Sequence, residues 1–90
     1  MGAPEAIARI HKPHGTKGEL AVWALVDNPG RRLEPGTTVR VTSETGERLA
    51  GPLTIVRRRM YHREWLLTFA GIDERAPLER WRKALLVVDA

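Results

Sequence analysis

Two β-prone stretches are separated by Lys12-Pro13-His14-Gly15-Thr16-Lys17-Gly18-Glu19, and this segment decides how the chain begins to fold. Pro13 holds φ at about −65°, which suits the second position of a β-turn, and Gly15 then falls at the fourth. Gly18 gives the backbone a second place where φ can be positive without a side-chain clash. Since a simple strand reversal needs no such sequence, the segment predicts a shaped loop that displays polar side chains.

Strand-like runs recur along the rest of the chain, with turn signals between them and little helical periodicity before the end. We expect strands at Ala6–His11, Glu19–Val26, Thr38–Ser43, Leu49–Arg59, Glu64–Phe69 and Leu85–Val88. Thr45-Gly46 and Tyr61-His62-Arg63 mark two of the connections. A helical turn is expected at Gly30–Leu33 and one short C-terminal helix at Ala76–Lys83. Six strands at this spacing predict an all-β fold, a small six-stranded antiparallel β-barrel.

The bulk composition bounds the class of protein. The chain has 90 residues, of which 42% are hydrophobic and 29% charged, so one domain with a modest core is expected. No apolar run reaches the ~18 residues of a membrane span, and no membrane partner is expected. The sequence has no cysteine, which removes disulfides and thiolate metal sites and agrees with the cytoplasmic localisation that we expect.

Positive charge is concentrated in the middle of the chain. The net charge is +4, and residues 31–63 carry eight arginines against three glutamates, a local balance of +5. Such a segment is typical of a surface for RNA or for acidic partners, and a solvated arginine-rich face accounts for it equally well. Twelve arginines against three lysines favour bidentate contacts to phosphate or carboxylate, or reflect genome composition or a hot habitat.

The run Arg57-Arg58-Arg59 is the densest part of this basic segment. On a strand, Arg57 and Arg59 point one way and Arg58 the other, so the three form one patch only where the strand ends or bulges. We expect the run at a strand end or at the rim of the barrel. Contact with RNA phosphate and protection of a sheet edge from mispairing are equally good interpretations.

The second expected strand is apolar on both faces. Its outer face carries Trp23 and Leu25, and a small barrel buries only the inner face of each strand. Something must therefore cover the surplus apolar side chains. We favour the C-terminal helix with Trp81 as the cover, and a partner surface is the alternative.

Metal binding and catalysis find little support. His11 and His14 have an H-x-x-H spacing, but Pro13 lies between them and breaks any helix that could align them, and the chain offers no cysteine to complete a site. No nucleophile motif, P-loop or dinucleotide fingerprint is present, and the residues after Gly18 are β-prone where a phosphate cradle needs a helix. We predict neither an enzyme nor a cofactor.

The loop and several later segments together resemble the amino-terminal barrel of the RimM family of ribosome maturation factors. The family signature is a PHGxxGE turn between the first two strands, which here is residues 13–19. The same plan continues in Asp27-Asn28-Pro29, Gly36, Val39-Arg40-Val41, Gly71-Ile72-Asp73-Glu74-Arg75-Ala76 and Ala84-Leu85-Leu86-Val87-Val88-Asp89. The resemblance covers most of the chain.

This resemblance implies a barrel similar to the second domain of elongation factor Tu. It also implies a further carboxy-terminal barrel that this chain does not contain, so we expect residues 1–90 to be a single domain, half of a two-domain protein. The implied function is chaperone-like assistance to maturation of the small ribosomal subunit and to processing of its RNA. The implied partners are the subunit precursor, small-subunit ribosomal protein nineteen and ribosomal RNA, and the protein is expected to be a monomer.

The loop and the arginine run supply the candidate binding residues. They are Lys12, Pro13, His14, Gly15, Lys17, Gly18, Arg57, Arg58 and Arg59. In a structural interpretation the proline and the glycines only fix the turn, whereas in a display interpretation the loop presents its cations to RNA phosphate or protein carboxylate. Three hypotheses follow: a ribosome assembly factor, a generic basic RNA-binding barrel, and a protein-docking module that uses the Trp23/Leu25 face.

Overall fold

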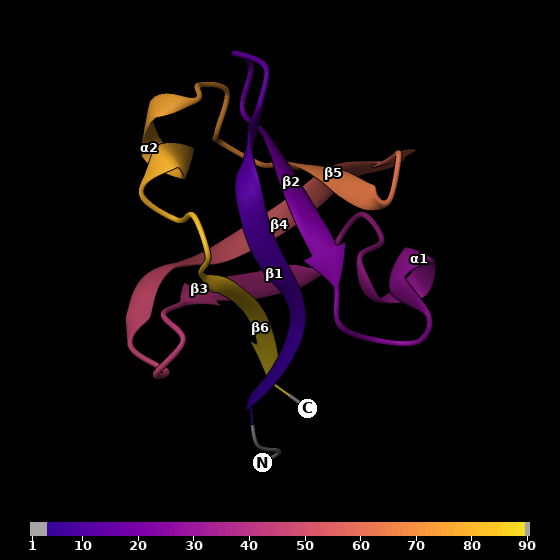
Figure 1. The fold of residues 1–90 in the computed structure, drawn as a ribbon, viewed down its shortest axis with the longest axis vertical. Helices are drawn as coiled ribbons and strands as arrows, with labels where there is room; N and C mark the ends of the chain where they lie inside the picture. The colour runs from indigo at the N-terminus through magenta and orange to yellow at the C-terminus, as the bar shows by residue number, and fades with distance from the viewer. Residues whose placement is uncertain (1–3, 90) are drawn as a thin grey trace.

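Six antiparallel strands close into a barrel in the computed structural model, which describes residues 4–89 (Figure 1). In chain order the elements are β1 (Pro4–His14), β2 (Glu19–Ala24), α1 (Pro29–Arg32), β3 (Thr38–Thr42), β4 (Arg48–Tyr61), β5 (Glu64–Phe69), α2 (Ala76–Glu79) and β6 (Leu85–Asp89). The strands follow one another around the barrel as β1-β2-β5-β4-β3-β6, and β6 returns to β1. The predicted all-β, six-stranded antiparallel barrel is confirmed.

β1 is longer than the sequence suggested. The strand was expected to end at His11, but it continues through Lys12 and Pro13 to His14. Pro13 lies opposite Leu20 of β2 and is buried. A proline is tolerated here because β6 pairs with β1 only in its first part, so beyond that point β1 has a partner on one side and a free edge on the other.

The core fills the barrel with aliphatic side chains and one phenylalanine. The largest fully buried side chains are Phe69, Ile7, Ile10, Leu20, Leu33, Ile55, Leu66, Leu67, Leu78, Leu86, Val22 and Val39. The short helices contribute to it, since Leu33 directly follows α1 and Leu78 lies within α2. None of the helices in residues 4–89 combines the length and the apolar character that crossing a bilayer requires.

The C-terminal helix differs from its predicted extent. It was expected to run to Lys83 but ends at Glu79, and turns occupy the residues that follow. Lys83 adopts φ +69°, and its N–H donates to the Ile10 carbonyl of β1 at 3.0 Å. This tertiary hydrogen bond replaces the one that a continuing helix would make. Trp81 consequently packs into the core cluster, with 8% of its surface exposed.

The turn between β1 and β2 comprises residues 15–18, and the hairpin that carries it projects beyond the barrel at the top of Figure 1. Gly15 and Gly18 both have positive φ, +69° and +87°. A Cβ atom on Gly18 would lie 2.7 Å from the Ile72 carbonyl oxygen, whereas one on Gly15 would meet nothing within 4 Å. The base of the turn is therefore packed against the connection between β5 and α2, while Gly15 lies in the open.

These two glycines give a matched test of the turn. Gly15→Ala should lower the free energy of unfolding by about 1 kcal/mol, because only the left-handed backbone conformation opposes it. Gly18→Ala should cost about 2–4 kcal/mol, because the methyl group also collides with backbone atoms. Urea denaturation of both variants measures the difference. Equal losses would contradict the close approach of Gly18 to residues 72–73.

Candidate functional site

Lys12 and His14 of the first group of predicted binding residues and Arg57 and Arg59 of the second meet on one outer face of the barrel, formed by β1, β2, β5 and β4. Gly15, Lys17 and Gly18 lie on the adjoining turn, whereas Pro13 is buried. Strand register places His14 opposite Glu19, which lies opposite Thr68, which in turn lies opposite Arg57. The next row outward from the turn consists of Lys12, Ala21, Leu66 and Arg59. We call this surface the basic face; its cations are Lys12, His14 when protonated, Arg57 and Arg59, with Lys17 on the adjoining turn.

The arginine run lies within β4, not at its end. The register shifts between Ile55 and Arg57, so a bulge precedes the run, and the strand then continues to Tyr61. Arg58 lies opposite the core residue Leu67, whereas Arg57 and Arg59 lie opposite residues of the outer face. Only these two arginines therefore belong to the basic face, in agreement with strand alternation.

Glu19 neutralises one of the cations. The Nε and Nη2 atoms of Arg59 each donate to the Glu19 carboxylate at 2.9 Å. The hydrogen bond from Arg59 lowers the pKa of Glu19 below its usual value, against a smaller opposing effect of burial, and the charges of Arg59, His14 and Arg57 lower it further. Glu19 thus serves as the partner of a cation. Within residues 4–89, no ion pair involves Arg57.

A stacked pair of rings lies beside the basic face on β1 and β2. The His11 imidazole and the Trp23 indole have centroids 4.3 Å apart and an angle of 21° between their planes. His11 can take this position because the register shifts between Ile10 and Lys12, which leaves it as the extra residue of a β-bulge. Its Nδ1 atom also contacts the Glu64 carboxylate. Trp23 is 40% exposed.

A second group of rings lies at the β4–β5 turn. The Tyr61 ring is 4.7 Å from the His14 ring and 4.5 Å from the His62 ring, centroid to centroid. Ala21 and Leu66 lie opposite each other on this outer face, yet each is only 1% exposed. Because their inward-pointing neighbours fill the core, the side chains around them on the outer face must provide their cover.

The positions of Trp81 and Trp23 show that the expected role of the C-terminal helix was wrong. The helix was predicted to cover the outer apolar side chains of the second strand, with Trp81 against them. Trp81 instead belongs to the core, and Trp23 is covered on one side by His11. Leu25, just past the end of β2, is 51% exposed. The face thus retains exposed apolar surface beside its cations.

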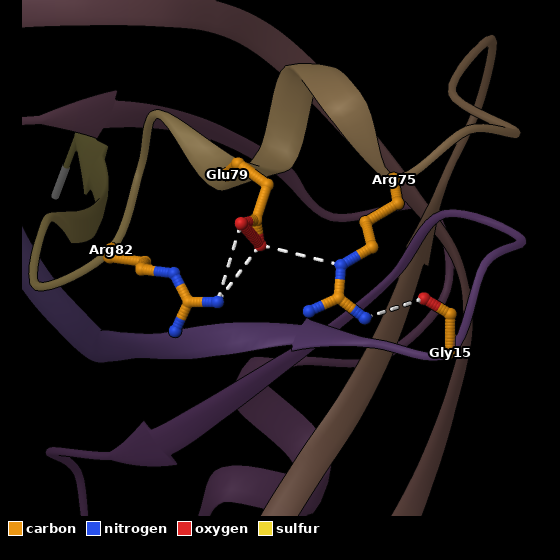
Figure 2. A network of polar contacts seen from close by, with 4 residues as sticks. All are labelled: Gly15, Arg75, Glu79 and Arg82. Carbon is orange, nitrogen blue, oxygen red and sulfur yellow. Dashed lines mark hydrogen bonds and ion pairs between the residues drawn. The ribbon is translucent and has the colours of Figure 1, made fainter.

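The turn itself is held in place through its backbone (Figure 2). Arg75 Nη1 donates to the Gly15 carbonyl oxygen at 3.1 Å, and Arg75 Nε donates to Glu79 at 3.4 Å. Arg82 Nη2 donates to the same carboxylate at 2.9 and 3.3 Å. No side chain of the turn takes part in this network, so Lys17, which is exposed, is available for other contacts.

Sequence reasoning missed Arg75 and Tyr61 as contributors to the site, and it named Trp23 only as part of an alternative docking face. Arg75 gave no signal beyond its place in a family-like segment, and its contact with Gly15 spans 60 positions of the chain. Trp23 and Tyr61 were noted, but no local pattern shows which rings meet across strands.

Within residues 4–89, no three histidine or acidic side chains are grouped to hold a metal ion. His11 and His14 instead belong to separate ring contacts.

The closed barrel and its clamped β1–β2 turn define a small β-barrel domain of a known kind. The model of the RimM N-terminal domain matches residues 6–90 of this chain. The ribosome maturation factor RimM of Kineococcus radiotolerans is 37% identical over 83 residues, covering 92% of this chain and 45% of that protein. The factor of the same name from Arthrobacter sp. is 41% identical over 83 residues, with 92% and 40% covered. The chain belongs to the RimM N-terminal domain family.

A solved structure agrees in fold. The 16S ribosomal RNA processing protein RimM from Pseudomonas aeruginosa superposes with a TM-score of 0.80 at 19% identity, covering 96% of this chain and 50% of that protein. The chain spans about half the length of the curated relatives it matches. The barrel described here therefore corresponds to one part of those longer proteins.

The Glu19–Arg59 pair predicts a pH-dependent contribution to stability. Because the pKa of Glu19 is lower in the folded protein, its contribution is fully present above the ordinary value of 4.5 and is lost as the pH falls through the folded pKa. Glu19→Gln should therefore unfold more readily than the parent at pH 7, and the difference should shrink below about pH 4. Urea denaturation across pH 3–7 measures it. Glu47→Gln removes an equal but exposed charge and should show no such trend.

Proposed function

We propose that this domain is a binding module of a factor for maturation of the small ribosomal subunit. It associates with the subunit precursor through the basic face and the β1–β2 turn, and it supports processing of small-subunit RNA without cleaving it. The observation that carries the proposal is the meeting of the PHGxxGE segment with Arg57 and Arg59 of β4 on one face, in a chain of the RimM family. The names of the relatives, ribosome maturation factors, agree with it.

The proposed mechanism is selective binding. Because the six strands close into a barrel, the domain presents a rigid surface. Binding to this surface favours one arrangement of RNA and protein over misassembled alternatives. No bond is made or broken by the domain. Small-subunit ribosomal protein nineteen and ribosomal RNA are the proposed contacts within the precursor, and the protein acts as a monomer in the cytoplasm.

The charges of the face support RNA as part of the target. Arg59 is held by Glu19, while Arg57, Lys12 and Lys17 have no ion-pair partner within residues 4–89. Cations that are not neutralised by the protein itself can replace the counterions of a phosphate backbone. Such contacts position a partner without reading its sequence.

A pull-down with the tagged protein tests the function directly. Small-subunit precursors should be enriched over mature subunits and over a control protein of scrambled sequence. Equal recovery with the scrambled control would refute the proposal. Affinity for unrelated structured RNA equal to that for the precursors would instead favour the hypothesis of a generic RNA-binding barrel.

Charge reversal on the turn should separate binding from folding. Lys17→Glu should leave the free energy of unfolding within about 0.5 kcal/mol of the parent, because the side chain is exposed, and should weaken precursor binding. Arg48→Glu makes the same charge change at the β3–β4 hairpin, away from the basic face, and serves as the control. Unchanged binding by Lys17→Glu would return the turn to a purely structural role.

A further inference from the structure

Trp23 is placed as a ring that can accept a second stacking partner. One side of its indole is stacked on His11 at 4.3 Å, and 40% of the side chain remains exposed. The other two tryptophans are more enclosed: Trp81 is buried in the core, and Trp65 is partly buried against it. Trp23 is thus the tryptophan that a ligand can reach most readily.

We propose that Trp23, supported by His11, is a stacking site for an unpaired base of single-stranded RNA whose backbone lies along the basic face. The proposal rests on the proposed function and specifies the kind of RNA element that the domain recognises. Stacking on an aromatic ring and phosphate contacts to cations are the two parts of single-strand recognition, and neither requires a particular base sequence.

The charge around the ring favours nucleic acid as the occupant. The cations of the basic face, of its two turns and of the position paired with Trp23 are Lys12, Lys17, Arg57, Arg59, Arg63 and Arg9. The anions beside them are Glu19, Glu64 and Glu44, the last of which pairs with Arg9. Six positive charges stand against three negative ones. A polyanion with exposed bases complements both the charge and the ring, whereas an apolar protein surface would have to desolvate these cations.

The ring is also held in position before any ligand arrives. His11 is fixed from two sides, by its stack on Trp23 and by its contact with Glu64. Trp23 itself is paired with Arg9 of β1, and the adjacent Val22 is paired with Trp65 of β5. A ring that is already ordered loses little side-chain entropy on binding, so more of the stacking energy appears as affinity.

A second ring lies farther along the same row. Val22 is paired with Trp65, and Trp65 with Met60, so the next residues on the three strands are Trp23, Glu64 and Tyr61. Trp23 and Tyr61 therefore lie two strands apart, about 10 Å. Tyr61 is 40% exposed, and a single strand that places one base on Trp23 passes toward it.

The test compares two probes that differ only in their bases. Fluorescence anisotropy measures binding of an oligouridine of eight nucleotides and of an abasic strand of equal length and charge, each at several salt concentrations. The parent chain should bind oligouridine more tightly than the abasic strand. Oligouridine should also quench tryptophan fluorescence, and this quenching should disappear in Trp23→Leu.

Three variants separate stacking from charge. Trp23→Leu should lower affinity for oligouridine by about fivefold to a hundredfold, with the abasic affinity and the salt dependence unchanged. Leu25→Ala, which removes a neighbouring exposed apolar side chain, should change neither affinity. Arg57→Gln should weaken both probes equally and reduce the slope of log K against log salt by about 0.7.

Equal affinity of the parent for the two probes, or an unaltered oligouridine affinity in Trp23→Leu, would overturn the stacking site. Failure of both probes to bind, with precursor pull-down intact, would also overturn it; the face would then dock a protein, and the proposed function would stand. Base-dependent binding without any enrichment of precursors would support the stacking site and reject the proposed function.

Discussion

Closure of the sheet between β6 and β1 is the constraint on which the rest of the structure depends. β1 pairs with β6 from Pro4 to Arg9 and with β2 from Ala8 to His14, so one strand both completes the barrel and supports the projecting hairpin. A slip of one residue would turn the cations of the outer face toward the core. The closure that buries the apolar residues therefore also fixes which charged residues share a surface.

The basic face is a thin layer built over a pair of apolar side chains. Ala21 and Leu66 are as buried as core residues, although they lie on the outside of the barrel. Rings and the Arg59–Glu19 pair lie on the same outer face, and these are groups that can also contact a ligand. An outer layer of this kind can add to packing and also serve the recognition that we propose, because its side chains bury a little apolar area on one side and remain accessible on the other.

Much of this architecture could be predicted from the sequence, because strand alternation and turn residues are local signals. The six strands and the positive φ of the turn glycines followed from such signals. The extension of β1 through Pro13 did not, since proline was interpreted as a turn residue and its tolerance depends on where β6 stops pairing. The early end of α2 depends on a hydrogen bond from Lys83 to Ile10 of the distant strand β1. The environment of Trp23 depends on the stacked ring of His11, which the β-bulge in β1 places beside it. Each of these departures comes from a contact between segments far apart in the chain.

The arrangement of the turn explains how stability and the proposed binding can be separated in so small a domain. The turn is fixed by the close approach of Gly18 to the backbone of Ile72 and by the bond from Arg75 to the Gly15 carbonyl. Both contacts use backbone atoms of the turn, so the charge of Lys17 is not needed to hold it. Binding residues on such a turn can change with the partner while the fold is kept, whereas the two glycines cannot change without cost. The glycines of the signature are therefore required by the fold, and the cations between and beside them are where recognition can reside.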